Sequence, residues 1–152
     1  MSDPINFRHI SVYQTPDESP GYLLWRVSMQ WRTAIEKALK TVSLTHPQFV
    51  VLATLGWLTK DGSKVNQVEI GKMASLDPNT TSQILRGLER KKLIKRINSV
   101  DERSKNPMLT PSGKDILTQA LPLVEQTDAQ FFAKISSDEL ESFIRLFHQL
   151  MR

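Results

Sequence analysis

Residues 77–113 read DPNTTSQILRGLERKKLIKRINSVDERSKNPMLTPSG, and they contain the clearest structural signals in the chain. Asp77 can cap a helix, and Pro78 suits its first turn because the N–H that proline lacks is not needed there. Between Arg86 and Lys105 there are eight basic and three acidic residues, a net charge of +5, whereas the whole chain carries +4. The positive charge is therefore concentrated in one unit, which is typical of a surface that binds phosphate groups.

The same stretch has the pattern of a helix followed by a hairpin. After the helix that begins at Pro78, apolar residues predict a strand over 93–97 and a returning strand at 108–109, with a polar loop between them. Before it, Asn66 and Glu69 form a capping box that predicts another short helix. The turn between the two helices spans only about four residues, which predicts a helix-turn-helix followed by a wing.

The rest of the chain predicts further helices and an N-terminal arm. The expected elements are an extended arm over 1–20, a helix over 21–42, a helix from Thr45 to about Leu58, a helix from Pro111 to about Phe132 with a kink at Pro122, and a last helix opened by Ser136. In the short helix after Asn66, we expect Val68, Ile70 and Met73 to be buried. The arm contains Pro4, Pro16 and Pro20 and the apolar Ile5, Phe7, Ile10 and Val12, so we expect it to be extended and to pack on another surface.

The helix after Asp77 has two distinct faces. Ile84, Leu85 and Leu88 form an apolar arc, with Thr81 near the same side. The opposite face carries Asn79, Ser82, Gln83, Arg86 and Arg90, with Thr80 at its flank. Asn and Gln can pair with adenine and Arg with guanine in the major groove, and the helix N-terminus offers N–H donors for a phosphate.

A polar face on an isolated surface helix needs no ligand. Here the face is poor in acidic residues, follows a tight turn and precedes a basic hairpin, so its context favours contact with DNA. At the hairpin tip, Arg103 can enter the minor groove, and Lys105 can reach a phosphate. Asp101 can position the guanidinium of Arg103 through a charge-assisted hydrogen bond.

Three segments of this stretch resemble the multiple-antibiotic-resistance regulator (MarR) family. They are Leu88–Arg96 (LERKKLIKR), Asp101–Arg103 (DER) and Leu109–Gly113 (LTPSG). Upstream, Tyr22–Arg26 and Leu44–Leu52 are similar to the first two helices of the family, so the resemblance covers roughly residues 20–150.

The resemblance implies a winged helix-turn-helix, mainly α with a small β-hairpin wing (α+β), with long N- and C-terminal dimerisation helices. The implied single domain spans 1–152, with an arm over 1–20, dimerisation helices over 21–42 and 111–152, and a DNA-binding lobe over 45–110. It implies DNA contacts at Asn79, Thr80, Thr81, Gln83 and Arg86, and a minor-groove contact at Arg103. For Thr81 the resemblance and the helical periodicity disagree, since the periodicity turns this residue inward.

Two residues depart from the family pattern. Lys92 stands where the family usually has Gly, because a left-handed conformation ends the helix there, and a residue with a Cβ destabilises that conformation by about 1 kcal/mol. We therefore expect this helix to end differently. Pro107 lies at the start of the returning strand and cannot donate a ladder hydrogen bond, which predicts a shortened wing.

The last helix predicts self-association. Its apolar residues cover more than one stripe, and Phe131, Phe132 and the arm residues Ile5, Phe7 and Ile10 add to the apolar surface. The last-helix residues concerned are Leu140, Phe143, Ile144, Leu146, Phe147, Leu150 and Met151. We expect a homodimer in which both chains use the same patch.

Composition excludes several function classes. The chain has no Cys, which excludes disulfides and thiol chemistry, and the spacing of its three His predicts no metal site. No apolar run reaches the roughly 20 residues of a membrane span, so we expect a soluble, cytoplasmic protein. No catalytic constellation or cofactor motif is present, so we expect no enzyme and no cofactor.

The sequence thus predicts a DNA-binding transcriptional regulator, a homodimeric repressor on a palindromic operator. Release by a small aromatic effector is a further hypothesis, for which Trp25, Trp31 and Trp57 are candidate pocket residues, although a tryptophan at helical spacing is more often part of a core. The alternatives are a winged helix that binds proteins, and an architectural protein that binds DNA without regard to sequence.

Overall fold

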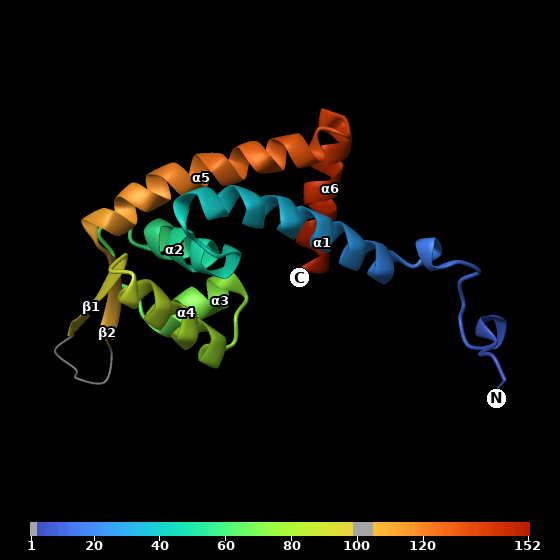
Figure 1. Ribbon diagram of the computed structural model, residues 1–152, viewed down its shortest axis with the longest axis horizontal. Coiled ribbons are helices and arrows are strands. Elements are labelled where there is room, and N and C mark those ends of the chain that lie inside the picture. The colour runs from blue at the N-terminus through green and yellow to red at the C-terminus, as the bar shows by residue number, and fades with distance from the viewer. Residues whose placement is uncertain (1–2, 99–104) are drawn as a thin grey trace.

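The computed structural model describes residues 3–98 and 105–152 (Figure 1). In chain order the elements are α1 (Pro20–Leu39), α2 (His46–Leu58), α3 (Gln67–Ala74), α4 (Pro78–Arg90), β1 (Ile94–Asn98), β2 (Lys105–Leu109), α5 (Pro111–Phe132) and α6 (Ser137–Leu150). Single 3-10 turns occur at Phe7–His9, Pro16–Glu18 and Lys40–Val42. The described part is therefore mainly helical with one two-stranded antiparallel sheet, as the sequence predicts.

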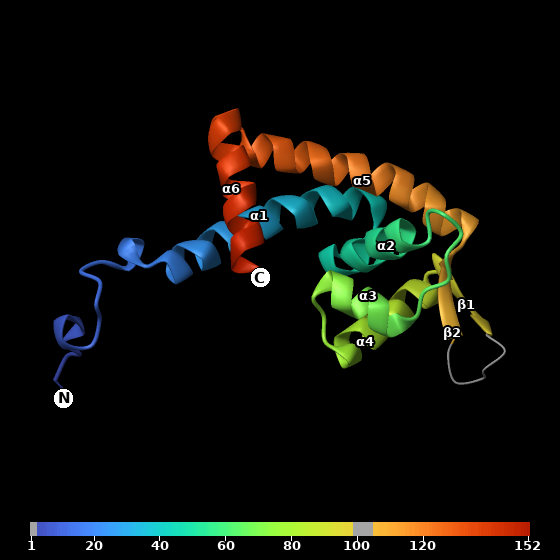
Figure 2. The ribbon, with the colours of Figure 1, turned by 180° about the vertical axis from the view of Figure 1, so that it is seen from behind.

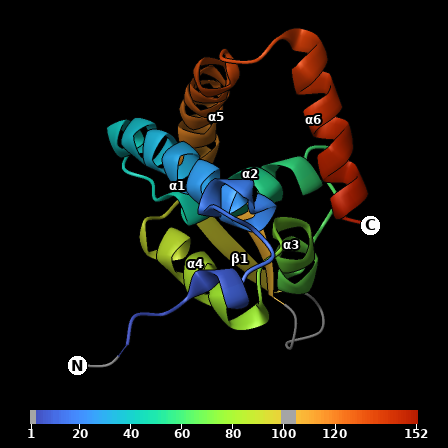
Figure 3. The same ribbon diagram turned by 90° about the vertical axis from the view of Figure 1, so that its right-hand side faces the viewer.

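The elements form a lobe and a helical frame. The long helices α1 and α5 lie side by side, and α2, α3, α4 and the hairpin form a lobe on one side of them (Figures 1 and 2). After the end of α5 the chain turns back into α6, which stands apart from α5 in Figure 3 and runs past α1, away from the lobe, in Figure 1. The N-terminal arm leaves α1 and runs away from the rest of the chain (Figure 1). In the described residues, no helix is both long enough and apolar enough to cross a membrane.

The helix starts confirm the capping patterns of the sequence. Complete capping boxes open α2, α3 and α6, through the pairs Thr45 with Gln48, Asn66 with Glu69, and Ser136 with Glu139. Asp77 and Thr110 cap α4 and α5, each followed by proline. Helix α5 continues through Pro122 without interruption. The starts are predictable because a cap and the amides that it satisfies lie within four residues of each other.

The end of α4 corrects one expectation. Lys92 keeps the left-handed conformation, with φ of 60°, and Leu93 N–H donates to the carbonyl of Leu88 at 3.0 Å. This is the helix ending that glycine favours, so the expectation of a different ending is wrong. Ser75 ends α3 in the same way, with φ of 54°.

The core lies where α1, α2, α4 and α5 meet. Ile35, Leu52 and Leu85, one from each of α1, α2 and α4, are fully buried. On α3 only Ile70 is buried as predicted; Val68 and Met73 are 59% and 51% exposed, so those two expectations are wrong. Because α3 has only eight residues and packs on α2 and α4 along one side, the other side remains in solvent.

The wing is not shortened by its proline. Strands β1 and β2 pair in register from Ile94 opposite Leu109 to Asn98 opposite Lys105, with Pro107 opposite Arg96. Thr110 N–H donates to the carbonyl of Leu93 at 3.0 Å, so these two residues form a hydrogen-bonded pair. Hydrogen-bonded and non-hydrogen-bonded pairs alternate along an antiparallel ladder, and this alternation makes Pro107 and Arg96 a non-hydrogen-bonded pair. Its missing N–H therefore breaks no ladder bond, and the expectation of shortening is wrong.

Candidate nucleic-acid interface

Helices α3 and α4 pack closely as a helix-turn-helix. Gly71 lies at this contact, where an added Cβ would lie 2.8 Å from Thr81 Oγ1 and 3.2 Å from the carbonyl oxygen of Leu76. The turn is closed by Leu76 N–H, which donates to the carbonyl of Gly71 at 2.9 Å. A side chain at Gly71 would push α4 away from α3, so glycine here sets the position of the candidate reading helix.

The same contact removes Thr81 from the candidate DNA-binding residues. Its side chain is fully buried, and its hydroxyl donates to the carbonyl of Asp77 at 2.8 Å. The periodicity of the helix was therefore right for Thr81, and the contact implied by the resemblance is wrong.

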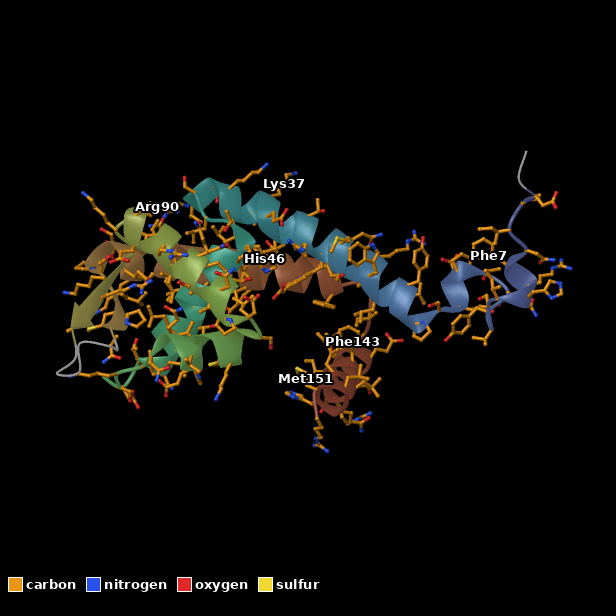
Figure 4. The ribbon with its side chains drawn as sticks, turned by 90° about the horizontal axis from the view of Figure 1, so that it is seen from below. Phe7, Lys37, His46, Arg90, Phe143 and Met151 are labelled. Atoms are coloured by element: carbon orange, nitrogen blue, oxygen red, sulfur yellow. The ribbon has the colours of Figure 1, made fainter. Side chains whose placement is uncertain are left out.

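The outer face of α4 carries the other candidates. Asn79, Gln83, Arg86 and Arg90 are exposed, and Thr80 and Ser82 are half-buried at the flanks. Leu85 and Leu88 hold the opposite face in the core. Arg90 lies at the C-terminal end of α4, on the outside of the lobe (Figure 4). The structure thus brings amide and guanidinium side chains together on one exposed helical face.

The N-terminus of α4 is capped by the protein's own anion. The Asp77 carboxylate accepts from Thr80 Oγ1 at 2.5 Å and from Thr80 N–H at 2.8 Å. These hydrogen bonds, first from the hydroxyl and then from the amide, lower the pKa of Asp77. A phosphate at this helix end would meet a carboxylate, so the expected phosphate site at the N–H groups is wrong, and the Thr80 hydroxyl hydrogen is already engaged.

The cations of the basic segment fall into two groups. Lys91 Nζ donates to the carbonyl of Ser43 at 2.6 Å and to Gln48 Oε1 at 2.7 Å, which ties the end of α4 to the start of α2. Arg96 is paired with Glu89, 3.3 Å from Nε to Oε2. Among the described side chains of this segment, Arg86, Arg90, Lys92 and Lys95 are exposed and take no part in these two contacts. The net charge therefore overstates how many side chains can meet phosphate.

Comparisons with known proteins agree with this geometry. Residues 35–126 match the family described as ArnR1-like, winged-helix domain. Over 143 residues the chain is 34% identical to the HTH-type transcriptional regulator YdcH of Bacillus subtilis, covering 93% of this chain and 96% of the relative. It is 31% identical over 136 residues to the HTH-type transcriptional repressor Rv2887 of Mycobacterium tuberculosis, covering 88% and 95%.

Solved structures share the fold. The structure of Rv2887 with p-aminosalicylic acid, described as a MarR family protein, matches with a TM-score of 0.68 and 29% identity over 88% of this chain and 99% of that one. A mutant MarR of Escherichia coli complexed with operator DNA matches with a TM-score of 0.78 and 22% identity over 87% and 93%. The chain belongs to the MarR family. The named relatives are transcriptional regulators and repressors, so this is a family of regulators and not of enzymes.

Part of the expected MarR interface lies outside the described residues. Asp101 and Arg103 fall in the segment 99–104, and although Lys105 begins β2, its side chain is not among those described. The minor-groove contact of Arg103 and the positioning role of Asp101 therefore stay predictions. Sequence reasoning missed the ties of Lys91 and the Glu89–Arg96 pair, because these partners come together only when the elements pack.

Proposed function

We propose that this MarR protein is a homodimeric repressor that reads DNA sequence with the outer face of α4. The observation that carries the proposal is the exposed set Asn79, Gln83 and Arg86 on a helix whose other face is fully buried. Helix α4 and the hairpin lie on the same side of the molecule, opposite α5 (Figure 1). A duplex can therefore meet the helix and the wing together.

Each side chain has a proposed role. Asn79, Gln83 and Arg86 contact base edges in the major groove, where amides suit adenine and guanidinium suits guanine. Ser82, Arg90, Lys92 and Lys95 contact the phosphate backbone, which fixes register without reading sequence. Thr80, expected to contact DNA, donates both its hydroxyl and its N–H to Asp77, so we propose no phosphate contact for it. In the wing, Arg103 enters the minor groove, Asp101 positions it and Lys105 contacts a phosphate. Because the partner is DNA, we place the protein in the cytoplasm.

The dimer would be formed by α1, α5 and α6. None of the α6 residues is buried in the single chain, and Leu146 and Leu150 are 53% and 78% exposed. A cavity of about 730 Å³ lies between these three helices, lined on α6 by Phe143, Phe147 and Leu150. Phe143 and Met151 lie far from the lobe that carries Arg90 (Figure 4).

A monomeric protein rarely leaves a large contiguous apolar patch exposed, such as the one that α1, α5 and α6 form here. We propose that the same face of a second copy covers it, with the arm residues Ile5, Phe7 and Ile10 at its margin. The two α4 helices would then enter successive major grooves.

We also propose that a small aromatic effector releases the DNA. The relative Rv2887 was solved with p-aminosalicylic acid and with salicylic acid. Of the three tryptophans, only Trp31 lines the large cavity, and its Nε1 donates to Asp128 Oδ1 at 2.7 Å. An effector acts only if it binds the DNA-competent and released states unequally, so it must favour a different spacing of the two α4 helices.

Selection of bound fragments from the source genome tests the proposal. We expect the fragments to share a two-fold symmetric site whose half-sites lie about 34 Å, one helical turn, apart. Retained fragments with no common sequence would instead indicate an architectural DNA-binding protein. Retention of no DNA at all would indicate a protein-interaction module.

A further inference from the structure

An ion pair joins the end of the reading helix to the wing. Glu89 lies in the last turn of α4 and Arg96 in β1, and Arg96 Nε lies 3.3 Å from Glu89 Oε2. The Arg96 side chain is 20% exposed and that of Glu89 45%. Helix α4 and β1 meet directly, so this pair crosses the joint between the two elements that the proposed function brings to DNA.

The surroundings of Arg96 make its partner important. Nε and Nη2 are buried, and neither donates a hydrogen bond to any group in the described residues. The strand register places Arg96 opposite Pro107, which is fully buried. Side chains in such a pair lie on the same face of the sheet, so Arg96 shares the face of the buried Pro107. Glu89 is the described anion that compensates this half-buried charge.

Glu89 stands in an unfavourable place for a carboxylate. The C-terminal end of a helix carries partial negative charge, which repels an anion. The surrounding segment has a net charge of +5 between Arg86 and Lys105, and a carboxylate there also repels DNA phosphates. A role in binding phosphate cannot account for Glu89, whereas holding Arg96 can.

We propose that Glu89 and Arg96 are positioning residues that fix the wing against α4, so that helix and wing contact the operator as one rigid unit. This inference rests on the proposed function. It predicts that removing Glu89 changes operator affinity in the direction opposite to the one that charge alone predicts. Removal of Glu89 makes the DNA-facing side more positive, which by electrostatics alone strengthens binding to every duplex. With the positioning role, the same change weakens operator binding, because the wing loses its fixed orientation.

The test compares affinities for the selected operator and for a scrambled duplex of equal length at one salt concentration. The variants are Glu89→Gln, Arg96→Met, Arg96→Lys and the double Glu89→Gln/Arg96→Met. We expect Glu89→Gln to lower operator affinity about tenfold while scrambled-duplex affinity is unchanged or higher. Arg96→Met alone and the double variant should each fall by about the same factor, because both residues act through one contact. Arg96→Lys, which keeps the charge, should recover most of the loss.

Lys95→Met is the matched control, because Lys95 is the neighbouring cation on β1 and is exposed. It should weaken both duplexes by the same factor and leave their ratio unchanged. The scrambled duplex also controls for folding, since an unfolded variant loses both affinities. If Glu89→Gln alone is too unstable, the double variant decides, because it leaves no half-buried charge without a partner.

Two results would overturn the positioning role. One is equal or higher operator affinity in Glu89→Gln, and the other is a double variant whose loss is the product of the two single losses. A wild-type protein that fails to distinguish the operator from the scrambled duplex is a different failure, since it contradicts the proposed function itself.

Discussion

Lys92 ends α4 in a left-handed backbone conformation, and its replacement by glycine tests that helix ending. It holds φ of 60° at the end of α4, where a Cβ is disfavoured. Lys92→Gly should therefore raise the free energy of unfolding by about 1 kcal/mol, measured by urea denaturation. Arg90→Gly, two residues earlier within the helix, should lower it by about the same amount. If both changes lower the stability, the left-handed ending is wrong.

His46 should make stability depend on pH. It is only 8% exposed and packs edge-to-face on Trp31. Burial lowers the pKa of His46 below its ordinary 6.5; Arg32 acts in the same direction, and Glu36 and Asp128 act against it. Below about pH 6.5, His46 is protonated more readily in the unfolded chain than in the folded one. The free energy of unfolding therefore falls as the pH drops below that value.

Urea denaturation at pH 7.5 and pH 5.5 measures this effect. The wild type should lose more stability between the two values than His46→Gln does. His9→Gln, at an exposed position in the arm, should keep the wild-type loss. An identical pH dependence in all three proteins would rule out a contribution from His46.

The end of α4, the start of β1 and the start of α5 meet closely at the base of the wing. A Cβ on Gly113 would lie 1.9 Å from the carbonyl oxygen of Leu93. Thr110 Oγ1 also donates to the carbonyl of Lys92 at 2.7 Å, so the start of α5 rests on the backbone that follows α4. No side-chain rotation relieves a clash with backbone.

Gly113→Ala should therefore destabilise the fold by about 3 kcal/mol or more, observed as a lower midpoint in thermal unfolding. Gly21→Ala is the control, since a Cβ there meets no described atom within 4 Å. Equal and small effects of the two substitutions would show that α5 does not approach Leu93 this closely.

These elements also show what the sequence can and cannot predict. Helix starts were predictable because Asp77 or Asn66 and their bonded amides are neighbours in the chain. The outer face of α4 followed from periodicity. The exposure of Val68 and the tie from Lys91 to Ser43 were not predictable, because each depends on which element packs beside another. The same holds for the Glu89–Arg96 pair.

For the assembled protein, the apolar face of α1, α5 and α6 predicts a dimer. Leu150→Glu places a charge on a residue that lines the cavity between these helices and is 78% exposed in the single chain. Burying that charge at an interface is unfavourable, so we expect the dimer dissociation constant to rise at least about tenfold in sedimentation experiments. Met73→Glu, on the 51% exposed side of α3, should remain dimeric. Dissociation of both variants, or of neither, would contradict this interface.

The central claim is that the outer face of α4 reads bases while neighbouring cations hold phosphates. The most direct test measures the affinities of wild type, Arg86→Ala and Lys95→Met for operator and scrambled duplexes over a series of salt concentrations. Arg86→Ala should lose about 1–3 kcal/mol on the operator and much less on the scrambled duplex. Lys95→Met should weaken both alike and reduce the salt slope by about 1. A uniform loss in Arg86→Ala, with an unchanged ratio of the two affinities, would contradict the claim.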